Sequence, residues 1–343
     1  MTREKIRIAI VGYGRLGMGV HRLVRMSRDM DVAQIITRDP ARIVKEAKGV
    51  PVFSIGNFAP LADVAVLCGG SKEDLFGKAT RVFAGRKLSG PEVLGHGPYF
   101  AQFFNTVDSF DTHVRINDYY NVMSKFAVLN RHTAIVSAGW DPGTFSLERV
   151  LADSFIPMAR HYTFWGPGVS QGHSDAVRRI KGVADARQYT LPVRKAVLSV
   201  RSGVAPRLDH RDKHTRLVWV VAKEGADRRR IAREIKSMPN YFADYDTKVI
   251  FISQNELLRK HRAYPHAGFV LASADKRYGL KSLIEYRCEW DSNPDGTAGI
   301  LVACVRACYR LNKMSMYGAF TMLDIPPVFY SVRTRNELLK NYM

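Results

Sequence analysis

The sequence predicts an α/β protein whose first domain is a doubly wound parallel sheet and whose second domain is α+β. Three observations lead to this fold class. A glycine-rich turn joins a strand pattern to a helix pattern near the N-terminus, strand and helix patterns then alternate to about residue 143, and longer alternating apolar segments follow. The 343 residues exceed what one ordinary core requires, so two domains are expected.

Composition indicates a folded, soluble chain with excess positive charge. Hydrophobic residues make up 46% and charged residues 24%, and 52 Lys and Arg against 32 Asp and Glu give a net charge of +20. Such a charge attracts nucleic acid, anionic membranes or small anionic substrates. The densest basic run, residues 228–236, has helical spacing and is most simply a solvated helix face, so we expect no specific nucleic-acid partner.

Targeting and cysteine patterns favour the cytoplasm. The apolar run before Gly12 is too short for a signal peptide or a membrane span, so we expect no membrane partner. The cysteines, Cys68, Cys288, Cys304 and Cys308, form no CxxC pair and have no histidine at zinc-like spacing. We therefore expect reduced thiols and no metal site.

The first element is a β-branched strand, residues 5–11, that ends in "GYGRLG" and leads into a helical pattern from Leu16 to Met26. Gly12, Gly14 and Gly17 stand in the G-x-G-x-x-G register, which in this context is a dinucleotide-binding fingerprint. Glycines permit a tight turn, and the helix N-terminus offers unpaired N–H groups to a pyrophosphate. The first domain is therefore predicted to be Rossmann-like, with Tyr13, Arg15 and Leu16 also beside the cofactor.

The second strand, Val32 to Thr37, ends in "TRD" and bears on the choice of nucleotide. An acidic residue usually holds the ribose of NAD at this point, whereas an arginine accommodates the 2′-phosphate of NADP. Thr37 and Arg38 therefore favour NADP. Asp39 would repel a phosphate unless it points away, Arg42 being a compensating cation, and the alternative is a surface arginine in a polar turn.

Three further strand patterns carry polar residues at their carboxyl ends: "DVAVLCGGS" at 63–71, "NTVDSFDTH" at 105–113 and "TAIVSAGWDPG" at 133–143. Ligands of open α/β sheets bind at this rim. The predicted cofactor contacts here are Cys68, Gly69, Gly70, Ser71, Thr106, Val107, Asp108, Gly139, Trp140, Asp141, Pro142 and Gly143. The basic segment from Phe76 to Gly90 is read as a surface insertion beside this crevice.

After Gly143, the segments "YTLPV", "RLVWVVA", "TKVIFIS", "GFVLAS" and "LIEYRCEW" predict a mostly antiparallel sheet with helices on one face. Near the C-terminus, apolar residues recur at helical spacing: Ile300, Cys304, Ala307, Cys308 and Leu311. That helix is expected to pack on the first domain.

Seven strings together resemble the meso-diaminopimelate dehydrogenase family over nearly the whole chain: "VGYGRLG", "FNTVDSFDTH", "SAGWDPG", "TFWGPGVSQGHSDA", "QYTLP", "MPNYFADY" and "SNPDGTA". The resemblance implies NADP-dependent (NADP+/NADPH) oxidative deamination of meso-2,6-diaminopimelate at its D-centre, giving L-2-amino-6-oxopimelate and ammonia, in lysine and peptidoglycan-precursor metabolism. It also implies a homodimer. The dinucleotide-binding domain would comprise residues 1–142 and roughly 292–343, and the substrate-binding and dimerisation domain residues 143–291.

The substrate carries two carboxylates and two ammonium groups, so its site needs groups of both signs. Asp108 and Asp141, beside the expected nicotinamide, would hold the reacting ammonium and orient the α-hydrogen, because positioning is the main demand on a protein in hydride transfer. Asp111 is an alternative to Asp108, and either could instead be a helix N-cap.

The family's contacts at the distal L-centre carry over to Thr190, Arg216, His266 and Asn293. Arg216 would clamp the distal carboxylate, since a bidentate guanidinium fixes both charge and orientation.

The family pattern also assigns the loop "FWGPGVSQGHSDAVRRI". Trp165 would shape an apolar wall, while Gln171 with Gly172, and less firmly Asp175, would bind the amino acid. The structural alternative is a tryptophan packed in a hinge and a capped helix start.

Departures from the family pattern and the basic surface leave two other functions open. Arg15 replaces an asparagine, Asp39 replaces one of two arginines, and Tyr264 and Ala267 flank His266 in "YPHAG". A broadened-specificity D-amino-acid or amine dehydrogenase is one alternative, and a non-catalytic NADP-binding regulator is the other. Retention of the residues for paired ammonium and carboxylate groups argues against a regulator.

Overall fold

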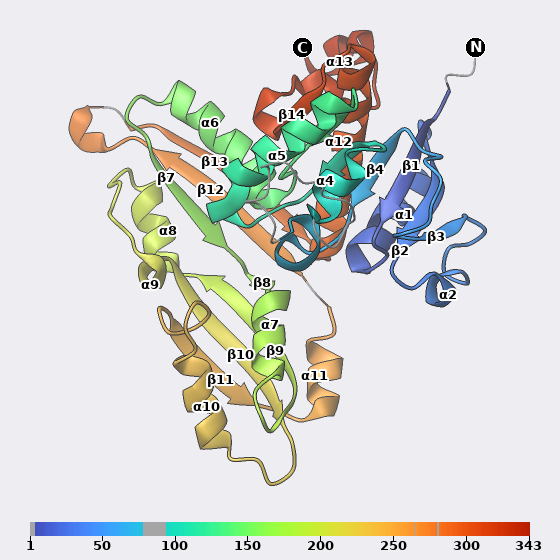
Figure 1. The fold of residues 1–343 in the computed structure, drawn as a ribbon. Coiled ribbons are helices and arrows are strands. Elements are labelled where there is room, and N and C mark those ends of the chain that lie inside the picture. The colour runs from blue at the N-terminus through green and yellow to red at the C-terminus, as the bar shows by residue number, and fades with distance from the viewer. Residues whose placement is uncertain (1–3, 78–93, 264, 280) are drawn as a thin grey trace. The chain divides into compact units, whose positions relative to one another are not determined.

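The computed structural model describes residues 4–77, 94–263, 265–279 and 281–343 (Figure 1). The chain divides into two compact units. Unit 1 comprises Met1–Leu147 and Pro294–Met343, and unit 2 comprises Glu148–Asn293. The fold class expected from the sequence is confirmed, with a parallel Rossmann-like sheet in unit 1 and separate sheets in unit 2.

Unit 1 contains a seven-stranded sheet in the order β14-β6-β5-β4-β1-β2-β3, and every pairing in it is parallel. The strands are β1 (Ile6–Val11), β2 (Met30–Thr37), β3 (Val52–Ser54), β4 (Val64–Leu67), β5 (Asn105–Asp108), β6 (Thr133–Ile135) and β14 (Gly318–Phe320). The strand order reverses between β1 and β4. This reversal is the switch point at which open α/β sheets bind ligands.

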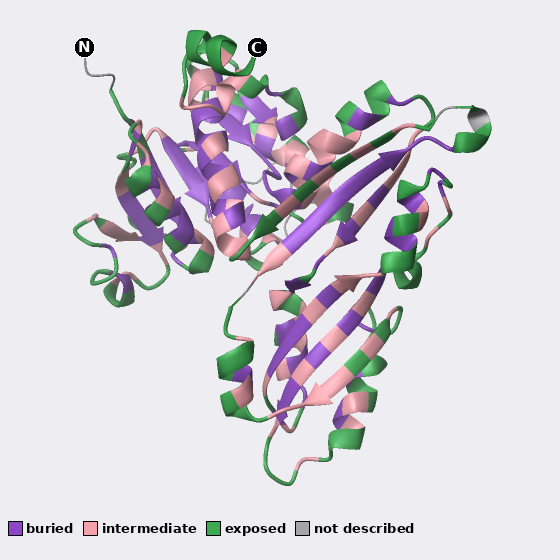
Figure 2. Cartoon of the chain, turned by 180° about the vertical axis from the view of Figure 1, so that it is seen from behind, coloured by how far each residue is buried: buried purple, intermediate pink, exposed green. Residues whose placement is uncertain are grey.

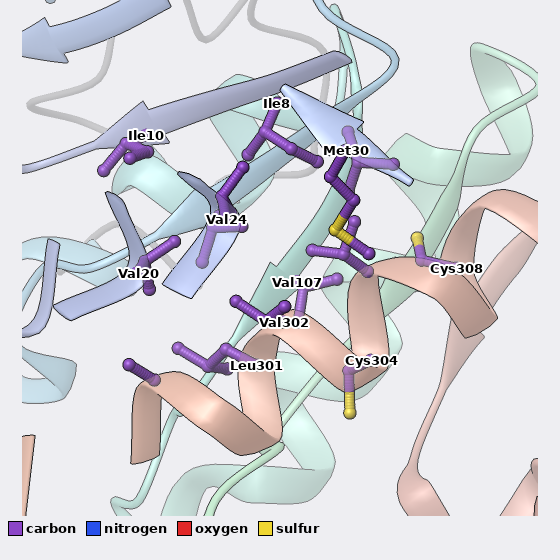
Figure 3. Close-up of a cluster of buried hydrophobic side chains, with 14 of the residues drawn as sticks. Ile8, Ile10, Val20, Val24, Met30, Val107, Leu301, Val302, Cys304 and Cys308 are labelled. Atoms are coloured by element: carbon purple, nitrogen blue, oxygen red, sulfur yellow. The ribbon is translucent and has the colours of Figure 1, made fainter. Parts of the chain in front are cut away.

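Helices cover both faces of this sheet. On one face, α1 (Arg15–Met26) and α12 (Asn293–Lys313) pack on β1 and β5 through the apolar cluster drawn in Figure 3, which includes Ile8, Val24 and Leu301. On the other face lie α4 (His96–Phe100) and α5 (Ile116–Leu129). Cys304 and Cys308 are fully buried in the first cluster, as the helical spacing predicted.

The C-terminal segment completes unit 1. After α12, β14 pairs with β6, with Gly318 opposite Thr133. The other elements of the unit are α2 (Pro40–Ile43), the beginning of α6 (Phe145–Phe155), α13 (Arg335–Tyr342) and the short helical turns Ser71–Leu75, His113–Arg115, Trp140–Thr144, Met322–Asp324 and Pro327–Phe329.

Unit 2 contains a four-stranded sheet, β11-β10-β9-β8, and a three-stranded sheet, β13-β12-β7. The strands are β7 (Arg160–Trp165), β8 (Gly168–Val169), β9 (Val183–Pro192), β10 (His214–Ala222), β11 (Asp246–Phe251), β12 (His266–Ser273) and β13 (Leu283–Trp290). All pairings are antiparallel except that of β10 with β11. That pair is parallel because the connection between its strands contains α10 (Arg228–Lys236) and crosses over the sheet.

Burial alternates along β10, where His214, Arg216, Val218 and Val220 face inward and the residues between them are half-buried (Figure 2). Val218 and Val220 pack beneath α7 (Gln171–Arg178) and α10. The remaining elements of unit 2 are α8 (Arg194–Arg201), α9 (His210–Lys213), α11 (Gln254–Lys260) and the 3-10 turn Lys276–Tyr278.

Several expectations from the sequence can now be placed. All four cysteines are free thiols. No helix among the described residues has the length and apolar character needed to cross a membrane. Most of the expected surface insertion, residues 78–90, lies outside the described residues, but its first residue was wrongly assigned to the surface. Phe76 is buried because its ring packs against Phe110 and Tyr119 at centroid distances of 6.1 and 5.1 Å.

Candidate functional site

The turn between β1 and α1 has a shape that two of its glycines make possible. Gly12 has φ +89°, in the region that favours glycine. A Cβ on Gly17 would lie 2.2 Å from the carbonyl oxygen of Gly12, so only glycine allows this packing of helix on strand. Gly14 differs, because nothing lies within 4 Å of the position of its Cβ. Its place in the turn leaves open space for a ligand.

The N-terminus of α1 has the character of an anion site. Gly14 is its N-cap, no side chain caps it, and its first turn contains no acidic residue. The N–H groups of a first helical turn have no partner within the helix and attract anions such as a pyrophosphate. The side chain of Tyr13 is buried, and its hydroxyl lies 2.5 Å from Nδ1 of His21.

The end of β2 shows how the chain accommodates Asp39. The carboxylate of Asp39 accepts the backbone N–H of Arg42 at 3.3 Å and caps α2. The exposed guanidinium of Arg38, which follows Thr37, lies 3.4 Å from a carboxylate oxygen of Asp74. Asp74 also accepts the N–H of Gly70 at 2.8 Å. Arg38 is thereby linked to the loop after β4, at the rim of the sheet.

The loops that follow β4 and β5 meet at this rim. The hydroxyl of Ser71 accepts the backbone N–H of Asp111 at 3.0 Å, and the side chain of Asp111 is exposed. Thr106 and Val107 are fully buried within β5. The structure thus brings together Ser71 and Asp111, two of the polar residues predicted to share the rim.

Asp108 lies at the end of β5 with its side chain fully buried. One carboxylate oxygen accepts the N–H groups of Phe110 and Ser137, each at 3.0 Å, and the other accepts the hydroxyl of Tyr119 at 2.7 Å. Burial raises the pKa of the Asp108 carboxyl to about 6. The side chain of Asp108 joins the loops after β5 and β6. In the loop after β5, the exposed aspartate is Asp111.

The loop after β6 contains Gly139, Trp140, Asp141, Pro142 and Gly143. The indole of Trp140 is buried edge-on against Phe145 at 5.8 Å, while Asp141 is partly exposed. Gly143 has φ +134°, and its Cβ would lie 3.5 Å from the sulfur of Met322. This loop therefore presents Asp141 from a well-packed base.

In unit 2, Arg216 lies on the inner face of β10, and the residue is only 8% exposed. It donates to the hydroxyl of Thr190, its cross-strand neighbour on β9, and its Cζ lies 3.9 Å from the ring centre of Tyr245. Among the described residues, no carboxylate pairs with Arg216 and its Nε has no hydrogen-bond partner. Burial lowers the pKa of the guanidinium, a penalty that an anionic ligand would relieve.

Two histidines near Arg216 are kept neutral. Nε2 of His214 accepts the N–H of Trp165 at 2.8 Å, and burial followed by the charge of Arg216 lowers the His214 pKa to about 3. The same two causes lower the pKa of His173 to about 4, and its Nδ1 lies 2.7 Å from the hydroxyl of Ser170. The Arg216 guanidinium therefore has two neutral imidazoles as neighbours.

Sequence reasoning missed His173, His214 and Tyr245 as neighbours of Arg216. A signal existed for His214, because the period of a strand places it on the same face as a residue two positions away. Tyr245 comes from a separate loop and had no such signal.

Trp165 and His266 form the second feature of unit 2. Their rings stack at 5.6 Å with an interplanar angle of 26°, and burial lowers the pKa of His266 to about 4. The backbone N–H of Gly166 donates to the carbonyl of Ala267 at 2.7 Å, which joins the ends of β7 and β12. The side chain of Ala267 is buried, and Tyr264 lies outside the described residues.

The other predicted residues of unit 2 lie in helices. Gln171 and Gly172 open α7, Gln171 half-buried and Gly172 exposed with free space around it. Asp175 forms an ion pair with Arg178 of the same helix, so its carboxylate already has a partner. Asn293 is the first residue of α12 and is partly exposed.

A glycine turn at the switch point of a parallel sheet, followed by a separate mixed-sheet unit, is the arrangement of a two-domain dinucleotide-binding protein. In the second unit, the buried guanidinium of Arg216 has no carboxylate partner among the described residues. The sequence profile of the diaminopimelic acid dehydrogenase C-terminal domain matches residues 139–292. The meso-diaminopimelate D-dehydrogenase of Acetivibrio thermocellus is 46% identical over 100% of this chain and 99% of its own length. That of Corynebacterium glutamicum is 40% identical over 97% of this chain and 98% of its own. The chain belongs to the meso-diaminopimelate D-dehydrogenase family.

Solved structures agree with this membership. The diaminopimelate dehydrogenase of C. glutamicum in complex with DAP is 38% identical, with a TM-score of 0.84 over 100% of both chains. A mutant meso-diaminopimelate dehydrogenase from Clostridium tetani with DAP has a TM-score of 0.85 at 39% identity, over 99% of this chain and 100% of the other. An engineered D-amino acid dehydrogenase bound to NADP+ has a TM-score of 0.80 at 36% identity, with the same coverage.

Proposed function

We propose that this protein catalyses the reversible, NADP-dependent oxidative deamination of meso-2,6-diaminopimelate at its D-centre. The substrate, NADP+ and water give L-2-amino-6-oxopimelate, ammonium, NADPH and a proton. The chain belongs to the meso-diaminopimelate D-dehydrogenase family, and one observation carries the proposal. The buried guanidinium of Arg216 has no carboxylate partner among the described residues. The distal carboxylate of the substrate would supply the missing anion.

The nucleotide would occupy the rim of unit 1. The residues fit it because Gly17 brings α1 against the turn, and the open space beside Gly14 faces an uncapped helix N-terminus. Residues 12–17 would hold the pyrophosphate, and Thr37 and Arg38 the 2′-phosphate, with the carboxylate of Asp39 engaged at its own helix. When bound, NADP+ accepts a hydride from the D-centre carbon. The engineered relative bound to NADP+ supports this choice of nucleotide.

The two ends of the substrate would be held by residues of opposite charge. Asp141, which is partly exposed, and Asp111, which is exposed, would hold the reacting ammonium and so orient its α-hydrogen. Asp108 would act as a positioning residue that fixes the two loops from within. Arg216 and Thr190, with His266 and Asn293, would bind the distal amino acid group, and Trp165, Gln171 and Gly172 would line the same site.

The substitutions in the C. tetani mutant support this set. They fall at a Gln, a Thr, an Arg, a Pro, a His and an Asn. Residues of the same types recur in this chain in the same order and at the same intervals: Gln171, Thr190, Arg216, Pro265, His266 and Asn293. Five of these six residues belong to the predicted substrate site.

A second candidate is a dehydrogenase of broader D-amino-acid range, which the likeness to the engineered D-amino acid dehydrogenase favours. The homodimer, the cytoplasmic location and the absence of nucleic-acid and membrane partners stay predictions.

A spectrophotometric assay of nucleotide reduction at 340 nm tests both candidates. The meso, LL and DD isomers of diaminopimelate and simple D-amino acids are each supplied with NADP+ or NAD+. We expect reduction with the meso isomer and NADP+, because only that isomer presents a D-centre for oxidation and an L-centre for the distal contacts. Comparable turnover of simple D-amino acids would favour the second candidate. Silence with every substrate would leave the non-catalytic regulator.

A further inference from the structure

Tyr245 is a contact of Arg216 that neither the sequence patterns nor the proposed function assigns. Its ring lies under the guanidinium, with 3.9 Å between the Cζ of Arg216 and the ring centre. Tyr245 directly precedes β11, which pairs in parallel with β10 so that Arg216 stands opposite Thr247. The strand pairing therefore brings this aromatic residue beside the guanidinium.

The loop before β11 holds the Tyr245 backbone in place. Its N–H donates to the carbonyl of Phe242 at 3.0 Å, and its own carbonyl accepts the hydroxyl of Thr247 at 3.3 Å. The ring of Phe242 is fully buried in the core beneath α7 and α10. The backbone of Tyr245 is thus anchored to the core of unit 2.

A ring holds a buried cation in a way that a carboxylate cannot. An aspartate at this position would fix the guanidinium but would also neutralise its charge, and the aspartate itself would repel the carboxylate of a substrate. The quadrupole of an aromatic face attracts the cation and leaves its N–H donors available. The other groups near Arg216 are the hydroxyl of Thr190 and the neutral imidazoles of His173 and His214.

We infer that Tyr245 is a positioning residue for the substrate: its ring holds the buried guanidinium of Arg216 in place without neutralising it, so that the full charge meets the distal carboxylate. This inference rests on the proposed function. It adds a determinant of selectivity for amino acids that carry a second carboxylate.

The test is a double-mutant cycle in the full-length protein with meso-diaminopimelate and NADP+. Tyr245→Leu removes the ring and is expected to lower kcat/KM about tenfold, chiefly through KM. Arg216→Met is expected to lower it about a hundredfold. In the Arg216→Met background, Tyr245→Leu should cost less than twofold more, because the ring acts only through the guanidinium. A multiplicative tenfold loss in the double variant would overturn the inference.

Two further variants separate the ring from other roles. Tyr245→Phe keeps the ring and should stay within about threefold of the wild type, whereas a loss equal to that of Tyr245→Leu would overturn the inference in favour of the hydroxyl. Tyr189→Leu is the matched control, because Tyr189 is a half-buried tyrosine of β9 whose hydroxyl contacts His261. It should change kcat/KM less than twofold.

A cycle on urea unfolding measures the coupling of Tyr245 and Arg216 without substrate. Tyr245→Leu should raise the unfolding equilibrium constant about tenfold more in the wild type than in the Arg216→Met background. Equal effects would overturn the contact between ring and cation. Failure of the proposed function gives a different result. If the wild type does not reduce NADP+ with meso-diaminopimelate, both the proposed function and the inference are wrong, whatever the unfolding cycle shows about the contact of Tyr245 with Arg216.

Discussion

Two buried charged side chains, one in each unit, are held in opposite ways. The Asp108 carboxylate has three hydrogen-bond donors from its own chain, whereas the Arg216 guanidinium has a hydroxyl and an aromatic ring. A buried charge without such partners costs several kcal/mol. The hydrogen bonds of the Asp108 carboxylate are all made within its own chain, whereas the Arg216 guanidinium can still bind an anion.

This difference predicts that two neighbouring aspartates respond differently to the loss of their charge. Asp111→Asn should lower kcat/KM for meso-diaminopimelate about a hundredfold, because a charged contact to the ammonium contributes about 1.5–3 kcal/mol. Asp108→Asn should lower it less than tenfold, because an amide oxygen still accepts the N–H groups of Phe110 and Ser137. Steady-state kinetics at pH 8 decide the order, and thermal melts show whether both variants fold. The reverse order would return Asp108 to the ammonium site.

The sequence placed both aspartates at the rim and assigned the ammonium contact to Asp108, with Asp111 as the alternative. A carboxyl end of a parallel strand is recognisable from pattern alone, since ligands gather there. Which side chain turns inward depends on Tyr119, whose hydroxyl comes from α5 and buries the Asp108 carboxylate. Contacts of this kind depend on tertiary structure and have no local signature. The same holds for Tyr245 under Arg216.

At the scale of elements, the glycine turn combines two different requirements. Gly17 is required by the packing of α1, since any Cβ would overlap the carbonyl of Gly12. Nothing lies within 4 Å of the position of a Cβ on Gly14, and its conformation at the N-cap, with φ −83°, is open to other residues. Gly17 is thus required by the fold, whereas Gly14 leaves space for the proposed nucleotide.

Alanine at each position separates these requirements. Gly17→Ala should lower the unfolding free energy by about 1–3 kcal/mol, because the helix must shift away from the strand. Gly14→Ala should cost less, about 0.5–1 kcal/mol, because alanine caps a helix less well than glycine. It should nevertheless weaken NADP+ binding about tenfold, since a methyl group would stand where the pyrophosphate approaches. Urea unfolding and calorimetric titration with NADP+ measure the two effects. Unchanged affinity in Gly14→Ala would place the nucleotide elsewhere.

Element prediction succeeded where periodicity was long and failed where pairing alone defines the element. The helices α1 and α12 could be predicted from the sequence, because apolar residues repeat along one face of a helix, as Cys304 and Cys308 do in α12. Strand β14 has only three residues, and its identity comes from pairing with β6, far away in sequence. The parallel pairing of β10 with β11 likewise follows from the crossover that contains α10.

At the scale of the whole molecule, buried histidines predict a loss of stability in acid. His214 has a folded pKa of about 3 against an ordinary 6.5, and His173 about 4. Unfolding releases such imidazoles to bind protons, so the stability they support is complete above pH 6.5 and is lost as the pH falls toward the folded values. Between pH 6.5 and 5, His214 alone accounts for about 2 kcal/mol.

Unit 1 should lose less stability, because Asp108 acts in the opposite direction. Its folded pKa of about 6 exceeds the ordinary 3.8, so its ionisation costs stability as the pH rises through 6, and acidification relieves that cost. His21 and His96 in the same unit have lowered pKa values and offset part of this relief. We therefore expect unit 2 to open first on acidification.

Native-state hydrogen exchange at pH 7 and pH 5 measures this difference unit by unit. The opening free energy of amides in β9 and β10 should fall by at least about 2 kcal/mol more than that of amides in β1 and β4. His214→Gln should remove much of this excess, since a glutamine oxygen can still accept the N–H of Trp165 and takes up no proton. His210→Gln, on exposed α9, is the matched control and should keep the excess. The prediction holds that protonation of the buried imidazoles links pH to the opening of unit 2. Equal falls of the opening free energy in both units would contradict it, and so would a pH dependence in His214→Gln equal to that of the wild type.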